Sequence, residues 1–146
     1  MKILIVPMAA MAETHGPAQR CRIMAEGFRS AGIEVATCMA GDVNYKEIEG
    51  VPNYYLDIPM PLGLPKIIAA RLYPAAQKLG ITSKKTVDSF DEVLRLTGNL
   101  DHDYLKKSVS SIRNAICETC PDAVYSEFNI SAIIAAKKEI SPFTQP

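Results

Sequence analysis

The sequence predicts an α/β fold in three layers, with a doubly wound, Rossmann-like parallel sheet between two layers of helices. The chain opens on Lys2-Ile3-Leu4-Ile5-Val6, a continuous apolar run typical of strands that are buried on both faces. Similar short runs alternate along the chain with longer segments of helical periodicity, which is the pattern of parallel α/β proteins. With 146 residues, 48% of them hydrophobic, residues 1–146 have the size and composition of one domain.

The first helix is expected between this strand and a second strand at residues 33–38. Gly16 and Pro17 stand where an N-cap and the first helical residue belong, and Gly32 suits the left-handed conformation that ends many helices. Between them, apolar residues recur at the i, i+3, i+4 and i+7 spacing of one helix face. Residues 2–38 therefore form one βαβ unit, which is right-handed in nearly all proteins.

The middle of the chain carries weaker signals. Residues 54–58 are a candidate third strand, and a proline-rich segment follows them. Residues 66–79 have helical character, but Pro74 is expected to end or kink that helix. A short helix is expected from about Asp88, within a largely polar segment.

The last third of the chain returns to a regular pattern. Apolar residues keep to one helix face over residues 101–118, and residues 123–126 make a fourth strand. Asn129 can cap a helix over residues 130–139. Residues 141–144 could begin a fifth strand.

The charge and hydropathy of the chain exclude some classes of partner. Sixteen Lys and Arg residues balance sixteen Asp and Glu residues, so no net field attracts the chain to nucleic acid or to an anionic membrane. No apolar run approaches the roughly 18 residues that cross a bilayer, so we expect no integral membrane segment. The opening run imitates a secretory signal, but Pro7 interrupts it and Glu13 follows soon after, which favours a strand.

The four cysteines do not have the pattern of a disulfide framework. Cys117 and Cys120 form a single C-x-x-C, which lacks the second pair that a zinc site needs, so we expect no metal. The motif also follows a helical segment, whereas a thioredoxin-like motif begins one. Reduced thiols are the expectation, and they suit a cytoplasmic location.

The predicted topology places a ligand cleft before any motif does. In doubly wound sheets, ligands bind outside the carboxyl ends of the strands, where the strand order reverses. The loops after Val6, Ile58 and Ser126 are therefore expected to surround one cleft.

Three segments, in their order and spacing, resemble the N-terminal half of a known family. They are the opening strand followed by Gly16-Pro17-Ala18-Gln19-Arg20, the helix end Ala31-Gly32-Ile33-Glu34-Val35, and Pro121-Asp122-Ala123-Val124-Tyr125-Ser126-Glu127-Phe128. Together they are similar to nucleotide-sugar glycosyltransferases of the GT-B fold. The resemblance covers residues 1–38 and 119–143 and is essentially absent between them.

This resemblance implies a division of labour between two halves. The N-terminal half of such an enzyme binds the acceptor, and a C-terminal half, which residues 1–146 do not include, binds the nucleotide-sugar donor. No G-x-G-x-x-G follows the first strand, so we expect no cofactor site in this chain. The chain alone should be inactive, as a fragment, a truncated reading frame or one subunit of a split enzyme.

The resemblance also suggests partners. They are a small-molecule or lipid-like acceptor and a donor-binding domain or subunit. An exposed apolar patch at the missing interface could lead to self-association, and association with a membrane surface stays open. The alternative function is a non-enzymatic, flavodoxin-like or Rossmann-like module that binds a small ligand or a protein partner.

A catalytic pair follows from the same resemblance. In the family, a histidine after the first strand acts as general base on the acceptor hydroxyl, and an aspartate after the later strand orients it. His15 and Glu127 are the candidates here, because imidazole titrates near neutral pH and Glu127 stands at the aspartate's position. Without a gap, however, the family's histidine aligns with Pro17, so a solvated loop histidine is the alternative for His15.

The acceptor site is expected around the same loops. Gly16 would present backbone N–H groups at a helix start, and Arg20 would face the cleft, with a plain surface position as its alternative. Flexible apolar side chains from two loops suit an apolar acceptor, and packing of these loops on the core is the simpler explanation. The candidate acceptor-binding residues are Met8, Met11, Gly16, Arg20, Met60, Leu62 and Phe128.

Overall fold

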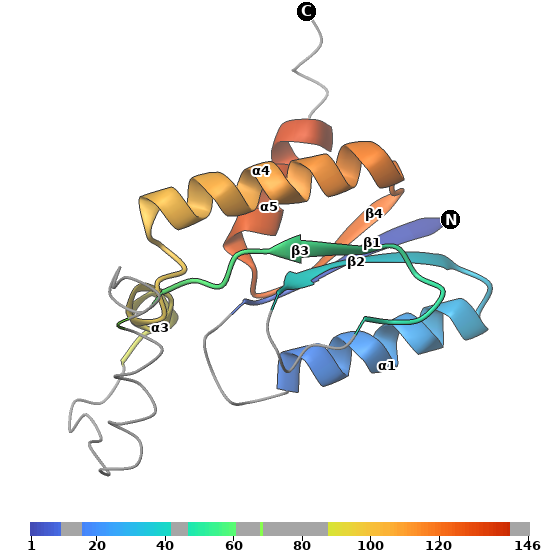
Figure 1. Cartoon of the computed structure of the whole chain (residues 1–146), viewed down its shortest axis with the longest axis horizontal. Helices are drawn as coiled ribbons and strands as arrows, with labels where there is room; N and C mark the ends of the chain where they lie inside the picture. The colour runs from blue at the N-terminus through green and yellow to red at the C-terminus, as the bar shows by residue number, and fades with distance from the viewer. Residues whose placement is uncertain (10–15, 42–46, 61–67, 69–87, 141–146) are drawn as a thin grey trace, which may run out of the picture.

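Four parallel strands form one sheet in the order β3-β2-β1-β4 (Figure 1). The computed structural model describes residues 1–9, 16–41, 47–60, 68 and 88–140. Within these ranges the strands are β1 (Lys2–Pro7), β2 (Glu34–Ala40), β3 (Asn53–Leu56) and β4 (Ala123–Glu127). β1 lies between its two neighbours, with Ile3 paired to Val35 of β2 on one side and to Ala123 of β4 on the other.

Helices cover both faces of this sheet. α1 (Gly16–Ser30) packs on one face, and α4 (His102–Thr119) and α5 (Ile130–Ile140) lie together on the other. The short helix α3 (Phe90–Leu96) lies beyond the carboxyl end of β3 (Figure 1). The predicted three-layer, Rossmann-like α/β fold with a parallel sheet is therefore confirmed.

The alternation of side chains along β1 explains why its whole apolar run is buried. Leu4 and Val6 belong to the cluster that packs against α4 and α5. Ile3 and Ile5 point the other way, into the cluster under α1. Successive strand residues face opposite sides of a sheet, so a strand that is covered on both sides needs apolar residues at every position.

The helix ends follow local signals in the sequence. Gly32, with φ 76°, adopts the left-handed conformation that was expected to end α1. The side chain of Ser89 accepts a hydrogen bond from Glu92 N at 3.3 Å at the start of α3. Asp101 caps α4 by accepting from Asp103 N and Tyr104 N at 3.1 and 3.0 Å. The starts of α3 and α4 thus each have a side-chain acceptor for backbone N–H groups of the first helical turn.

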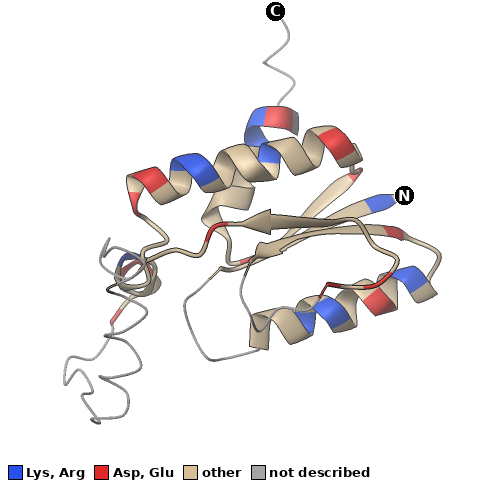
Figure 2. Cartoon of the chain, in the orientation of Figure 1, with Lys and Arg blue, Asp and Glu red and all other residues tan. Residues whose placement is uncertain are grey.

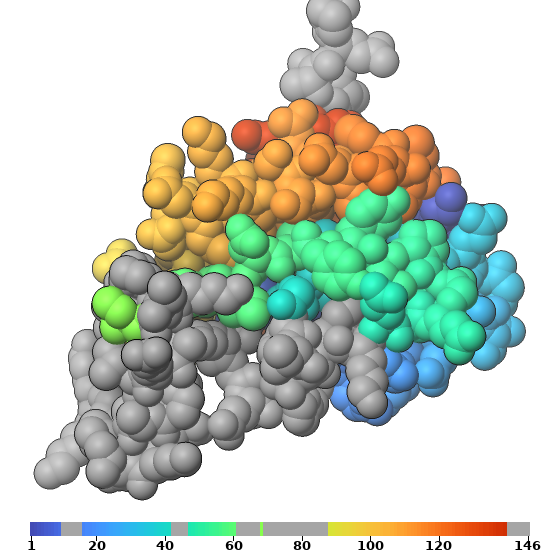
Figure 3. Space-filling view, in the orientation of Figure 1, coloured from blue at the N-terminus to red at the C-terminus, as the bar shows by residue number. Residues whose placement is uncertain are grey.

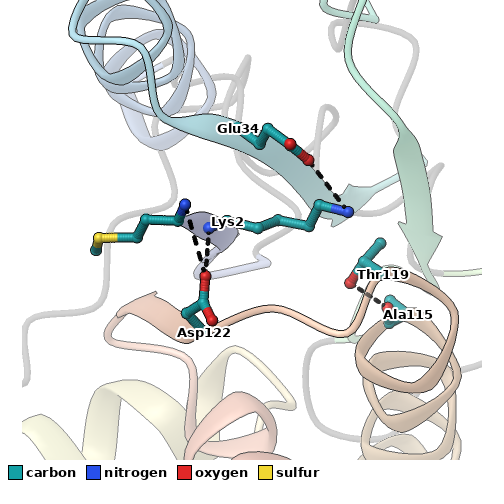
Figure 4. Close-up of polar contacts among 6 residues, drawn as sticks. Lys2, Glu34, Ala115, Thr119 and Asp122 are labelled. Carbon is teal, nitrogen blue, oxygen red and sulfur yellow. Dashed lines mark hydrogen bonds and ion pairs between the residues drawn. The ribbon is translucent and has the colours of Figure 1, made fainter.

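The amino-terminal edge of the sheet is held by one carboxylate (Figure 4). Asp122 Oδ2 accepts a hydrogen bond from Lys2 N at 2.7 Å and lies 3.9 Å from the N-terminal amine. On the other side, Lys2 Nζ lies 3.3 Å from Glu34 Oε2. Lys2 therefore links the starts of β1, β2 and β4, and we call these contacts the Asp122 clamp.

The surface carries charges of both signs. Both α1 and α4 carry basic as well as acidic side chains (Figure 2). In the space-filling view, β3 lies directly against α4, and the two elements are in contact (Figure 3). Among the described residues, no helix has both the length and the apolar character needed to cross a membrane.

Some expectations fall on parts of the chain that are not described. Apart from Ile68, the helix predicted over residues 66–79 lies outside the described residues, and so does the fifth strand predicted over residues 141–144. The other predicted elements are found, with bounds that differ by one or two residues: β3 covers Asn53–Leu56 where the prediction was 54–58.

Core packing predicts a large cost for truncating Ile112, which is fully buried on α4. We expect Ile112→Ala to lower the free energy of unfolding by about 2–5 kcal/mol, because it removes buried methyl groups and leaves a cavity. Urea denaturation followed by circular dichroism measures this. The matched control is Ile133→Ala on α5, where the side chain is 59% exposed. Its effect should stay within about 0.5 kcal/mol, and equal effects of the two substitutions would contradict the described core.

Candidate functional site

The carboxyl ends of the strands meet at one edge of the sheet, which we call the carboxyl edge. The strand order reverses there, because β1 is followed by β2 on one side while β4 pairs with β1 on the other. Pro7, the last residue of β1, pairs in register with Glu127, the last residue of β4. α1 also begins at this edge, at Gly16 (Figure 1). This is the position at which doubly wound sheets bind ligands.

Glu127 is the best-defined charged side chain at the carboxyl edge. It shares a face of β4 with Ala123, which packs against the cluster under α1. Its side chain is only 12% exposed, and its Oε1 lies 2.5 Å from Nη2 of Arg20, whose side chain is 61% exposed. A largely buried carboxylate needs such a partner, because losing hydration is costly for a charge. The ion pair thus connects α1 to the end of β4.

Cys21 lies on the buried side of α1, next to this ion pair. Burial, and then the negative charge of Glu127, raise the pKa of Cys21 to about 12. The thiol is therefore protonated at neutral pH. Because the thiolate is the nucleophilic form of cysteine, Cys21 is an apolar packing group beside the site.

A buried amide connects the turn after β4 to the end of β1. Asn129 Nδ2 donates to the backbone oxygen of Pro7 at 2.9 Å, and Asn129 Oδ1 accepts from Ala132 N at 3.2 Å. Asn129 N also donates to Ser126 Oγ at 3.2 Å. The expected helix cap is confirmed, and the same side chain additionally fixes the two strand ends relative to each other. Phe128 takes a left-handed conformation in this turn, with φ 53°.

A second buried amide brings the segment after α3 to the same edge. Asn99 Nδ2 donates to the backbone oxygen of Ala9 at 3.0 Å. Gly98, with φ 79°, packs so closely that an added Cβ would lie 2.0 Å from the Met60 backbone oxygen. The segments after β1 and β3 are thus joined through the turn that follows α3.

Two exposed aromatic rings lie against each other at this edge. The rings of Phe90 and Phe128 have centroids 5.4 Å apart and are tilted by 56°. Phe128 is 64% exposed and Phe90 is 47% exposed. Exposed apolar surface of this kind suits contact with an apolar group of a ligand or partner.

The structure brings together several of the residues predicted for the site. Arg20 and Glu127 are in contact, Met8 follows β1 directly and is half-buried, and Phe128 lies in the turn after β4. Met60 is half-buried against Gly98. Gly16 is exposed, and it is the first residue of α1, where the prediction placed it one step before the helix. His15, Met11 and Leu62 lie outside the described residues, so the predicted pair of His15 and Glu127 stays a prediction.

Sequence reasoning missed three contributions to the carboxyl edge. The contact between Arg20 and Glu127 was not expected, since each was assigned to a different role. Asn99 and Phe90 were in the segment with the weakest pattern. The adjacent Gly98-Asn99 is a turn signal that could have drawn attention to this segment, but nothing local predicts which strand end it contacts.

Two surface hollows lie away from the carboxyl edge. One, of about 350 Å³, lies at the amino-terminal edge and is lined in part by Lys2, Arg29 and Thr119. The other, of about 390 Å³, lies between α4 and α5. Neither includes Glu127 or Arg20, and ligand sites of parallel sheets lie at the other end of the strands, so we assign the candidate site to the carboxyl edge. In the described part of the chain, no group of three or more His, Cys, Asp and Glu side chains is arranged to hold a metal ion.

Removing the Asn129 amide should loosen the carboxyl edge. Asn129→Ala takes away a helix cap and a buried hydrogen bond to Pro7 O, so we expect the free energy of unfolding to fall by about 1–3 kcal/mol. The matched control is Asn114→Ala, at an exposed position on α4. Urea denaturation of both variants measures the difference, and an equal, small effect would show that the Asn129 amide does not hold the two strand ends.

The buried thiols should make stability fall at high pH. Burial raises the pKa of Cys21 and of Cys38 from 9.0 to about 12. The unfolded chain therefore loses these protons at lower pH than the folded protein. The free energy of unfolding should be insensitive to these groups below pH 9 and should decrease as the pH rises from 9 towards 12.

Denaturation titrations across this pH range test the prediction. The double substitution Cys21→Ala and Cys38→Ala should weaken the decrease, which also has a contribution from buried Tyr104, whose pKa burial raises to about 12. Cys117→Ser, at an exposed position, should leave the decrease unchanged. A decrease that is the same in all three proteins would exclude the two buried thiols as its cause.

No protein-family profile matches the chain, and no curated protein matches it. The function is therefore inferred from the residues at the carboxyl edge and from the order of the sequence motifs that supply them.

Proposed function

We propose that this chain is the acceptor-binding half of a glycosyltransferase that moves a sugar from a nucleotide diphosphate sugar to an acceptor hydroxyl. The segments that resemble such enzymes, near the two ends of the sequence, supply β1, α1, β2, β4 and α5. These elements are neighbours in the fold, although more than half of the chain separates them in sequence. The motif-bearing parts therefore form one contiguous structure.

The observation that carries the proposal is the position of Glu127. This carboxylate ends β4, faces α1 and stands in register with the last residue of β1. A carboxylate with this position can orient a basic group supplied by the loop between β1 and α1. His15 belongs to that loop and directly precedes Gly16, where α1 begins.

In the proposed mechanism His15 is the general base. Its imidazole accepts the proton of the acceptor hydroxyl while the hydroxyl oxygen forms a bond to the anomeric carbon of the sugar. The bond from that carbon to the nucleoside diphosphate breaks in the same step. Glu127 stabilises the imidazolium that results and keeps the ring in a productive orientation.

Arg20 has a positioning role in this proposal. Its guanidinium contacts Oε1 of Glu127, and we assign Oε2 to the interaction with His15. A charge partner for one oxygen restricts the rotation of the carboxylate. Arg20 would thus support the base indirectly, through Glu127.

The acceptor would bind against the apolar part of the same edge. Met8, Met60, Phe90 and Phe128 come from four different segments that converge there. Half-buried methionines and exposed aromatic rings suit a flexible or lipid-like acceptor. The nucleotide sugar would come from a donor-binding domain or subunit, since residues 1–146 carry no glycine-rich phosphate loop after β1.

The ion pair also favours a second candidate, a binding module without catalysis. Because Arg20 already contacts Glu127, the carboxylate can be explained as a structural partner of α1. The same edge would then bind a small apolar ligand or a protein through Phe90 and Phe128. The two candidates differ in whether a base at residue 15 matters.

An activity assay on the assembled enzyme tests the proposal. The chain is produced together with the polypeptides encoded beside it in the genome, and complexes that co-purify are assayed for release of nucleoside diphosphate from nucleotide sugars. We expect activity in the complex and none in the chain alone. His15→Ala should lower kcat about 10²–10⁴-fold, the usual contribution of a general base.

Two further variants separate the assigned roles. Glu127→Gln should lower kcat, since the neutral amide cannot stabilise an imidazolium. Arg95→Ala, an exposed position on α3, is the control and should leave kcat unchanged. An active complex in which His15→Ala keeps full kcat would reject the assigned base. Complexes that bind apolar ligands but never cleave a nucleotide sugar would favour the binding module.

A further inference from the structure

The four cysteines of the chain divide into two kinds. Cys21 and Cys38 are buried, whereas Cys117 and Cys120 are exposed. Burial holds the buried thiols in their protonated form, and it also keeps reagents away. Only Cys117 and Cys120 are therefore accessible for thiol chemistry in the folded protein.

The two exposed cysteines lie within one helical turn of each other. Cys117 belongs to the last turn of α4, and Cys120 is the residue that caps this helix, with its N–H bonded to Ile116 O at 2.8 Å. The thiol of Cys120 turns back over the helix, where its Sγ lies 3.3 Å from the backbone oxygen of Cys117. Residues three apart at a helix end are surface neighbours. Only a small change of side-chain conformation is therefore needed to bring the two sulfur atoms together.

The backbone at Cys120 gives a second reason to consider this pair. Cys120 has φ 46° and ψ 58°, the left-handed conformation that glycine adopts without steric cost at helix ends. Gly32 and Gly98 follow this rule elsewhere in the chain. A non-glycine residue is strained in this conformation. The thiol of Cys120 points towards the preceding helical turn, which carries Cys117.

We propose that Cys117 and Cys120 form a reversible dithiol–disulfide pair that small disulfides such as glutathione disulfide oxidise. The thiolate of one cysteine attacks a sulfur of glutathione disulfide, forming a mixed disulfide and releasing one glutathione thiolate. The second cysteine, as thiolate, then attacks the protein sulfur of the mixed disulfide and releases the other glutathione thiolate. The pair loses two electrons and two protons, and one glutathione disulfide becomes two glutathiones.

The pair lies beside the Asp122 clamp. Only Pro121 separates Cys120 from Asp122, whose carboxylate holds Lys2 N at 2.7 Å (Figure 4). Thr119, just before Cys120, donates from Oγ1 to Ala115 O at 2.6 Å within the same helix end. A disulfide across this turn would restrict the connection from α4 to β4, and with it the position of the carboxylate. Oxidation should therefore tighten the pairing of β1 with β4 at its amino-terminal end.

Mass spectrometry after incubation with glutathione disulfide tests the proposal on the native chain. We expect the wild type to lose two hydrogen atoms at the peptide that contains both cysteines, and to carry no stable glutathionyl group. Cys117→Ser and Cys120→Ser should each keep one glutathionyl group on the remaining cysteine, because the second displacement cannot occur. Dithiothreitol should restore the starting mass in every case.

A wild type that retains glutathionyl groups as stably as the single variants would overturn the proposal, and so would modification of Cys21 or Cys38 before the exposed pair. The conformational consequence is measured separately by hydrogen exchange. The amide of Lys2 should exchange more slowly in the oxidised wild type than in the reduced protein or in oxidised Cys117→Ser. Equal exchange rates would overturn the link to the Asp122 clamp.

Discussion

The whole arrangement depends on the burial of β1 between two parallel neighbours and two layers of helices. Leu4 and Val6 on one face, and Ile3 and Ile5 on the other, connect both apolar clusters through a single strand. The pairings of β1 with β2 and with β4 then place the motif-bearing ends of the chain beside each other. Without this central strand, neither the carboxyl edge nor the Asp122 clamp would exist, because each consists of residues from opposite sides of β1.

Buried side-chain amides set the geometry at the carboxyl edge. Asn129 and Asn99 each donate to a backbone oxygen just at or after the end of β1, at Pro7 and Ala9. Buried backbone oxygens need a donor, and here the donors come from the segments that follow β4 and α3. The bonds therefore satisfy the end of one strand and at the same time fix two segments that carry Phe128 and Phe90. The positions of these two aromatic residues therefore follow from the need of buried backbone oxygens for a hydrogen-bond donor.

The two edges of the sheet differ in the chemistry they offer. At the carboxyl edge, Glu127 is largely shielded and pairs with Arg20, which suits a fixed catalytic or structural carboxylate. At the amino-terminal edge, Asp122 is 65% exposed and neighbours the exposed thiols, which suits regulation by solution conditions. A parallel sheet separates these edges by the length of its strands, and β1 and β4 contribute residues to both of them.

Local patterns determined most elements of this protein. The apolar run from Lys2 to Val6, the left-handed stop at Gly32 and the cap at Asn129 could each be recognised from a few adjacent residues, because steric and hydrogen-bonding rules act over short distances. The edge of the sheet to which the candidate site is assigned followed as well, since all carboxyl ends of a parallel sheet share one edge. Only the tertiary structure decided the strand order, the pairing of Arg20 with Glu127 and the contact of Asn99 with Ala9. These contacts join residues far apart in sequence, and their formation depends on how α1 and the turn after α3 dock on the sheet, which no local periodicity encodes.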